Sequence, residues 1–154
     1  MRDFNETDKK KKQARIQTEE NPGNLSKESL LEVESAVKAS LKDGYLSCPT
    51  VWRMAKEANV PKIAVGKITD RLGIRITNCQ LGCFSIEKTL YDKSSQKNTD
   101  NAVITMINTL KESNQLTCAK VFDLARQYKL KPMVIADEIN AMGLKIHGCQ
   151  LGCF

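Results

Sequence analysis

The side chains of this chain that could do chemistry are its six cysteines. A cysteine thiolate binds soft metal ions, and two thiols can exchange electrons by forming a disulfide. Four of the cysteines belong to a six-residue block, CQLGCF, that fills residues 79–84 and again 149–154. The candidate metal or redox residues are Cys48, Cys79, Cys83, Cys118, Cys149 and Cys153.

The two blocks are the ends of a tandem duplication. A shift of 70 positions aligns residues 46–84 (the first copy) with residues 116–154 (the second copy) without a gap, and 12 of the 39 aligned pairs are identical. All six cysteines fall in identical pairs, although only about a third of the positions match. This contrast makes the thiols candidates for a role beyond packing.

Metal binding is one interpretation of the cysteines. Each copy offers a C-x3-C pair and one upstream cysteine, which are three thiolates for zinc or an iron–sulfur cluster. A closed tetrahedral site needs a fourth ligand. His147 could supply it in the second copy, but Thr77 stands at the equivalent place in the first.

Three other interpretations remain. A framework of structural disulfides does not suit a protein expected in the cytoplasm. A redox switch would bring Cys48, at a helix start that favours a thiolate, within disulfide reach of Cys79. We favour the fourth interpretation, in which the cysteines are buried and Leu81 and Phe84 close each module around a turn at Gly82. On it no cofactor is expected.

The apolar spacing predicts a helix at the start of each module. Ser26 is expected to cap the first helix, which Gly44 ends, and Asp100 to cap its counterpart over 101–113. Ser47 and Thr117 are predicted to cap a second helix in each copy.

A third helix follows in each copy and is predicted to end near Gly73 or Gly143. Residues 74–77 and 144–147 then alternate apolar and polar side chains, as a short strand does. The expected fold is mainly α, with two tandem trihelical helix-turn-helix modules, each followed by a short β-strand or turn.

The segment 51–72 carries a resemblance. Ala55 would lie where two helices cross, Asn59 can take a left-handed turn, and Val65 and Ile68 would anchor the second helix of the pair. This segment resembles the helix-turn-helix superfamily of DNA-binding proteins, and the strand predicted after it resembles the winged-helix branch.

The resemblance implies that the third helix lies in the major groove and that basic side chains hold phosphates. Two features depart from this pattern: Ile63 and Gly66, with Pro61, replace base-reading side chains, and Asp137 and Glu138 would repel DNA at the second copy. The candidate DNA-binding residues are Arg53, Lys56, Lys62, Lys67, Arg71 and Arg75.

Charge and composition support two modules with polar surroundings. We expect a disordered tail at 1–25, modules at 26–84 and 100–154, and a linker at 85–99. The net charge is +6, and the first module holds nine basic and six acidic side chains against six and five in the second. The run Lys9–Lys12 is interpreted as a solvated tail.

Several function classes are excluded or disfavoured. His147 is the single histidine, and no Gly-rich phosphate loop, paired acid constellation or dinucleotide fingerprint appears, so we expect no enzyme and no catalytic residue. No apolar run is long enough for a bilayer, and the N-terminus lacks an apolar stretch, so a cytoplasmic protein without a membrane partner is expected.

These observations predict a small DNA-binding transcriptional regulator that responds to thiol chemistry or to a metal. The alternative is a non-enzymatic accessory or scaffold protein that binds a protein partner, or a metal through its cysteines. In either case the second module is a candidate for pairing with a protein or with itself.

Overall fold

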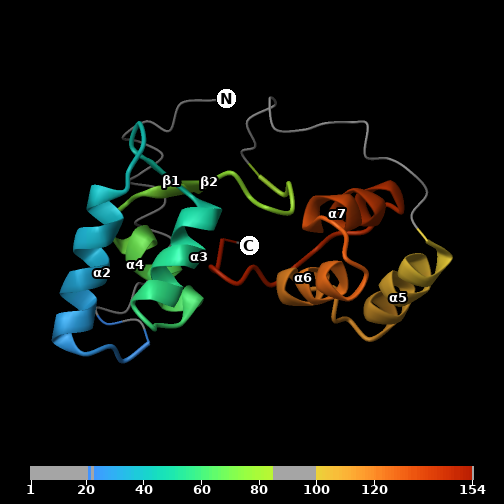
Figure 1. The fold of residues 1–154 in the computed structure, drawn as a ribbon, viewed down its shortest axis with the longest axis horizontal. Coiled ribbons are helices and arrows are strands. Elements are labelled where there is room, and N and C mark those ends of the chain that lie inside the picture. Colours follow the sequence, from blue (N-terminus) through green and yellow to red (C-terminus); the bar gives the residue numbers. More distant parts are fainter. Residues whose placement is uncertain (1–20, 22, 85–99, 154) are drawn as a thin grey trace. The chain divides into compact units, whose positions relative to one another are not determined.

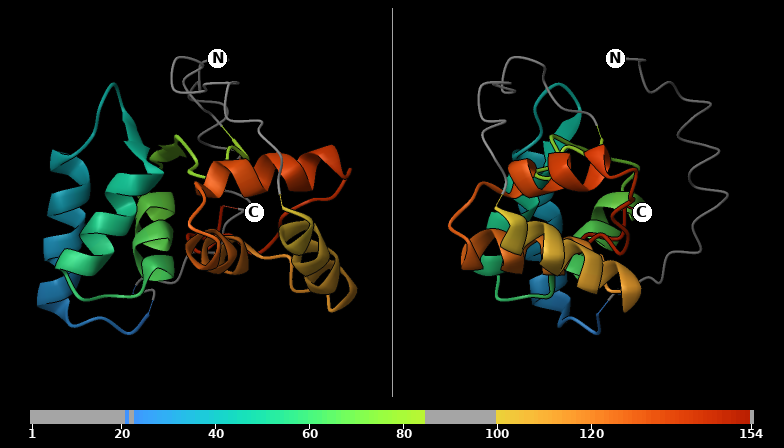
Figure 2. Two further views of the ribbon diagram at one scale, coloured as in Figure 1. Left: turned by 45° about the vertical axis from the view of Figure 1, so that its right-hand side comes forward. Right: turned by 90° about the vertical axis from the view of Figure 1, so that its right-hand side faces the viewer.

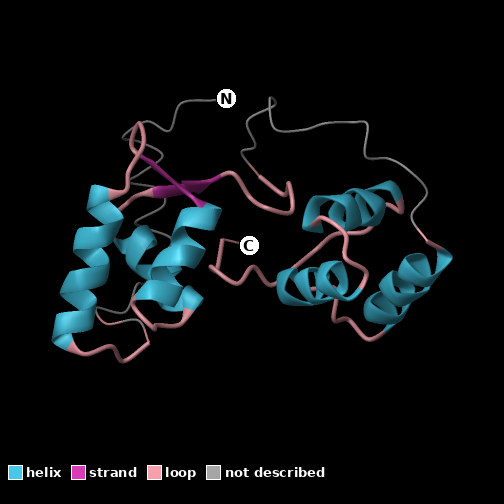
Figure 3. Cartoon of the chain, viewed as in Figure 1, coloured by secondary structure: helices cyan, strands magenta, loops and turns pink. Residues whose placement is uncertain are grey.

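The computed structural model describes residues 21, 23–84 and 100–153 and divides them between two compact units (Figure 1). Unit 1 ends at Asn78 and also takes in Leu151–Cys153, whereas unit 2 runs from Cys79 to Gln150. The described chain is mainly helical, as predicted (Figure 3). The expected linker at 85–99, and residues 1–20 and 22 of the expected tail, lie outside the described residues.

Unit 1 packs three helices and a short parallel strand pair. In Figure 2 the helices lie side by side, and the strands are close to one end of α3. The elements are α2 (Lys27–Ala39), β1 (Tyr45–Ser47), α3 (Cys48–Glu57), α4 (Lys62–Arg71) and β2 (Arg75–Thr77). Leu46 of β1 stands opposite Ile76 of β2. The strand predicted after the third helix is confirmed in this copy.

Unit 2 repeats the three helices but not the strand pair. Its helices are α5 (Asn101–Glu112), α6 (Cys118–Gln127) and α7 (Pro132–Ala141). The short strand or turn predicted after the third helix is reduced here: over 100–150 the structure has a single parallel bridge, between Thr117 and His147, in place of a strand at 144–147.

The predicted helix caps are confirmed. The side-chain oxygens of Ser26, Ser47, Asp100 and Thr117 each accept a hydrogen bond from a backbone N–H two or three residues later, over 3.1 to 3.4 Å. Each such bond satisfies one donor that the first turn leaves without a partner, and it stabilises the helix by about 1 kcal/mol. The capping residues therefore fix where four of the helices begin.

The end predicted for the first helix is wrong. Helix α2 ends at Ala39, and the Ser40 N–H bonds back to the Ala36 carbonyl. Gly44 lies beyond it, at φ +80°, in a turn closed by hydrogen bonds of 2.8 and 2.9 Å between the backbones of Lys42 and Tyr45. Gly44 supplies the left-handed conformation for this turn and not for a helix end.

The helix-turn-helix corner is confirmed in both copies. Asn59, at φ +52°, joins α3 to α4, and Lys129, at φ +53°, joins α6 to α7. One residue later, the Val60 N–H bonds to the Ala55 carbonyl over 2.9 Å, which is the bond of a Schellman helix end. Ala55 is only 3% exposed, so the small residue expected at this corner is buried there.

The placement of the CQLGCF blocks differs from the predicted modules. Leu81, from the first copy, is 1% exposed and belongs to the core of unit 2. Leu151, from the second copy, is also 1% exposed and belongs to unit 1, where its backbone lies against Gly66 of α4. The first block caps the helices of the other copy. The second block is divided, because Leu151–Cys153 belong to unit 1 whereas Cys149 and Gln150 contact Cys118 of their own copy. Because the blocks are identical, their sequence does not specify which module each one closes.

A substitution at Gly66 tests whether Leu151 packs on α4, because the sign of its effect on the free energy of unfolding depends on that contact. In an open helix, Gly66→Ala would raise the free energy of unfolding by about 0.5–1 kcal/mol. Here a Cβ atom would overlap the Leu151 carbonyl oxygen, so we expect Gly66→Ala to lower it by about 1–3 kcal/mol in urea unfolding.

The control removes Leu151, whose carbonyl oxygen a Cβ atom at position 66 would overlap. In a chain that stops at residue 148 the same substitution should become stabilising, and Ser35→Ala, at an exposed position of α2, should stay within about 0.5 kcal/mol in both backgrounds. A stabilising Gly66→Ala in the full chain would contradict the packing of Leu151 on α4.

Candidate functional site

A tight turn in the first CQLGCF block brings two cysteines together. Gly82 takes φ +73°, and its N–H donates to the Cys79 carbonyl over 2.9 Å. The Cys79 N–H donates in turn to the carbonyl of Phe84 over 3.4 Å, which closes the block on itself. Cys83 is exposed on this turn, whereas Cys79 is only 5% exposed.

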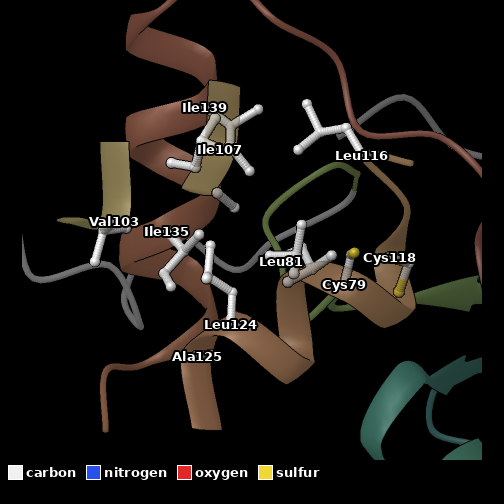
Figure 4. Close-up of a cluster of buried hydrophobic side chains, with 12 residues drawn as sticks. Cys79, Leu81, Val103, Ile107, Leu116, Cys118, Leu124, Ala125, Ile135 and Ile139 are labelled. Carbon is white, nitrogen blue, oxygen red and sulfur yellow. The ribbon is translucent and has the colours of Figure 1, made fainter. Parts of the chain in front are cut away.

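The block is anchored in the core of unit 2. Leu81 and Cys79 belong to one cluster with side chains from α5, α6 and α7, among them Leu124 and Ile135, and Cys118 lies at the same edge of this cluster as Cys79 (Figure 4). Burying one leucine is worth about 1.5–3 kcal/mol. Leu81 thereby holds the turn, and the two thiols on it, in a fixed place.

The first thiol pair favours a thiolate at Cys79. The Cys83 thiol donates a hydrogen bond to the Cys79 sulfur, which lowers the pKa of Cys79 from 9.0 to about 6. Burial acts in the opposite direction, and the backbone N–H groups of Leu81 and Cys83 add to the lowering. The pKa of Cys83 is raised, first because its proton makes the bond to Cys79 and then because of burial.

A second thiol pair lies in the same unit. Cys118, the first residue of α6, shares a hydrogen bond with Cys149, and this bond followed by burial raises the pKa of Cys118. The Gln150 side-chain amide donates to the Cys118 sulfur over 3.7 Å, which opposes the shift. The thiolate expected at a cysteine on a helix start is therefore not favoured at Cys118.

The sulfur pairing differs from the predicted Cys48–Cys79 pair. The thiol that contacts Cys79 is Cys83, and Cys48 is buried in unit 1. The equivalent pair in the second copy, Cys118 and Cys149, does form as a hydrogen-bonded contact. All six cysteines are free thiols.

The predicted metal sites, each with three cysteines of one copy, are not what the structure groups. Cys118 and Cys149 contact each other, and Cys79 and Cys83 of the first copy lie in the same unit. His147 is exposed, and its backbone carbonyl, not its ring, contacts Cys118, by accepting the N–H over 3.0 Å. Over residues 21, 23–84 and 100–153, no three or more histidine, cysteine, aspartate or glutamate side chains are placed to hold a metal ion.

The predicted DNA-binding side chains lie on α3, α4 and β2 of unit 1, and half of them are exposed. Arg53, Lys56 and Lys67 are exposed, whereas Lys62, Arg71 and Arg75 are half-buried. The helix pair thus keeps three exposed basic side chains, which we call the α3–α4 basic face, and Arg53 among them lies 3.8 Å from the carboxylate of Glu57 in an exposed ion pair.

The half-buried basic residues have partners inside unit 1. The Lys62 ammonium lies 3.4 Å from the centre of the Trp52 ring, a cation–π contact. Arg71 of α4 forms an ion pair with Glu34 of α2, with each side chain about a fifth exposed. Lys62 and Arg71 therefore help to hold the helices of unit 1 together.

One side of α4 is covered. Leu151 lies against Gly66, and a Cβ atom on Gly152 would come within 2.9 Å of the Ile63 side chain. Of the positions where a recognition helix would carry base-reading groups, Gly66 is buried under Leu151, whereas Pro61 and Ile63 stay exposed. In unit 2, Asp137 and Glu138 of α7 are half-buried.

The sequence indicated the cysteines and the basic side chains described above, but not the sets that they form. The pairing of Glu34 with Arg71 joins positions 37 apart, and no sequence period indicates it. The four cysteines that lie in unit 2 come from both copies: Cys79 and Cys83 from the first, and Cys118 and Cys149 from the second. A comparison of the two copies does not indicate this set.

Comparisons with known proteins add no relative: no family model, no curated protein and no solved structure matches the chain. Among the helices of the described ranges, none combines the length and the apolar character that a membrane span requires.

The second thiol pair gives a pH test. Replacing Cys149 with alanine removes the hydrogen bond that does most to raise the pKa of Cys118. We expect the alkylation of Cys118, followed by mass spectrometry of the tryptic peptide 112–120, to shift its midpoint to lower pH in Cys149→Ala. The matched control is Cys153→Ala, which changes a cysteine of unit 1. Equal shifts in both variants would contradict the assigned pairing.

Proposed function

We propose that this chain is a small, non-enzymatic DNA-binding regulator that contacts the phosphate backbone with the α3–α4 basic face. The observation that carries the proposal is a difference between two units with the same helix-turn-helix corner. Arg53 and Lys67 of unit 1 correspond, 70 positions on, to Asp123 and Asp137 of unit 2. The same helix pair forms with basic residues at these positions in unit 1 and with acidic residues in unit 2. Folding alone therefore does not require basic side chains there.

The six predicted positions make the difference quantitative. In unit 1 all six are basic, which gives a charge of +6. Their equivalents are Asp123, Arg126, Pro132, Asp137, Ala141 and Lys145, which sum to zero. Basic side chains gathered on a helix pair attract a polyanion by releasing its counterions. Unit 2 lacks this attraction, and its carboxylates repel phosphate.

The mode of contact follows from the apolar residues of α4. Ile63 and Gly66 face Leu151 and Gly152, so the side of α4 that they form offers no polar group to base edges. Exposed Arg53 and Lys56 of α3, with Lys67, suit phosphate contacts, which position a protein on DNA without reading its sequence. The proposal is therefore binding with low sequence preference and a strong dependence on salt.

Charge reversal tests the proposal. In the triple variant Arg53→Glu, Lys56→Glu, Lys67→Glu we expect the affinity for duplex DNA to fall at least about tenfold at low salt. The slope of log K against log salt should become shallower by about 0.9 for each phosphate that the variant no longer neutralises. Fluorescence anisotropy with a labelled duplex at several salt concentrations measures both quantities.

The matched control moves the same charge in unit 2. Lys111, Lys120 and Lys145 are exposed, and their reversal to glutamate changes the net charge equally. We expect the control to keep the salt slope and most of the affinity. Equal losses in the two variants would mean that overall charge, and not this face, binds DNA. A wild-type chain that does not bind DNA at low salt would leave the accessory-protein alternative.

A further inference from the structure

We propose that Cys79 and Cys83 are a redox pair that a small hydroperoxide oxidises to a reversible disulfide. The proposal does not rest on DNA binding, and it replaces the pairing of Cys48 with Cys79 expected from the sequence. It assigns to the first CQLGCF block a chemical role in addition to its role as a packing cap.

The geometry places the two sulfurs for this reaction. The backbone bonds between Cys79 and Gly82 and between Cys79 and Phe84 close the turn, and the Cys83 thiol already donates to the Cys79 sulfur. A disulfide requires the two sulfurs to approach to about 2.05 Å, with the Cα atoms within about 7 Å. The two thiols lie four residues apart on a turn that these backbone bonds close, so the chain itself keeps them near each other.

The two thiols have different parts in the reaction. Cys79 is the nucleophile, because a thiolate and not a thiol attacks an electrophile, and the hydrogen bond from Cys83 holds its pKa at about 6. Since Cys79 is only 5% exposed, a small oxidant suits it better than a bulky disulfide. Cys83 is exposed and keeps its proton, so it acts second, as the resolving thiol.

The steps balance with hydrogen peroxide as the oxidant. The Cys79 thiolate attacks one peroxide oxygen and the O–O bond breaks. The hydroxide that leaves takes the Cys83 proton and becomes water, and Cys79 becomes a sulfenic acid. The Cys83 thiolate then attacks the Cys79 sulfur, forms the S–S bond and displaces hydroxide, which a solvent proton converts to a second water. The two cysteines lose two electrons and the peroxide gains them.

The second block supplies an internal comparison, because it has the same six residues in other surroundings. The turn is repeated there, with Gly152 at φ +76°, but Cys149 contacts Cys118. A C-x3-C sequence alone would make both blocks oxidise alike. On our proposal the first block oxidises faster, because the thiol that contacts Cys79 is the other cysteine of its own block, whereas Cys149 is in contact with Cys118 of α6.

Peptide mapping of the full-length chain tests the proposal. After limited hydrogen peroxide and blocking of free thiols, trypsin yields peptide 76–88 with both cysteines of the first block and peptide 146–154 with both of the second. We expect peptide 76–88 to lose two hydrogen atoms and to regain them with a reductant. Peptide 146–154 should oxidise at least about tenfold more slowly.

Two substitutions at Cys83 separate its roles. Cys83→Ser keeps a hydroxyl that can donate to Cys79, so the alkylation midpoint of Cys79 should stay near its wild-type pH. Peroxide should then leave a sulfenic acid that a dimedone-type probe labels. Cys83→Ala removes the donor, and the midpoint should move up toward the ordinary range of about 8.5–9. Far-ultraviolet circular dichroism checks that both variants keep their helices.

Three results would overturn the proposal: equal oxidation rates in the two peptides, an intramolecular disulfide at Cys79 that persists in Cys83→Ser, or a stoichiometric metal in freshly isolated protein that protects the thiols of peptide 76–88. None of these results depends on whether the chain binds DNA. Failure here and failure of the proposed DNA contact are therefore distinguishable.

Discussion

The burial of two leucines, Leu81 and Leu151, is the interaction on which the rest of this structure depends. Each is 1% exposed, and each comes from a block whose own copy lies in the other unit. Three short helices of 10 to 13 residues bury little apolar surface by themselves. A leucine that contributes about 1.5–3 kcal/mol is then a large share of the stability of either unit.

The local elements could be read from the sequence, because caps and turns depend on residues close in the chain. Ser47 and Thr117 start helices by bonding three residues ahead, and Asn59 turns the corner by its own left-handed backbone. The role of Gly44 was predicted wrongly for a related reason. A glycine indicates a residue with left-handed backbone, but not whether that residue ends a helix or belongs to a turn.

The long-range sets could not be predicted in this way. The identity of the two CQLGCF blocks hides their exchange, since a pattern that fits both modules equally cannot assign either one. The segment 144–147 keeps its partner, since His147 bridges to Thr117, but its pairing stops at one bridge, whereas in unit 1 Leu46 and Ile76 pair as well. The set of four cysteines in unit 2 results from the exchange, so the sequence did not predict it either.

The same exchange links packing to chemistry. The N–H groups of Leu81 and Cys83 and the thiol of Cys83 all help to hold a negative charge on Cys79. They converge on that sulfur because the turn is fixed, and Leu81 anchors the turn in the core of unit 2. A leucine that leaves this core would release the donors, and burial without donors disfavours a thiolate. The reactivity of Cys79 is thus a consequence of how tightly its own block is packed.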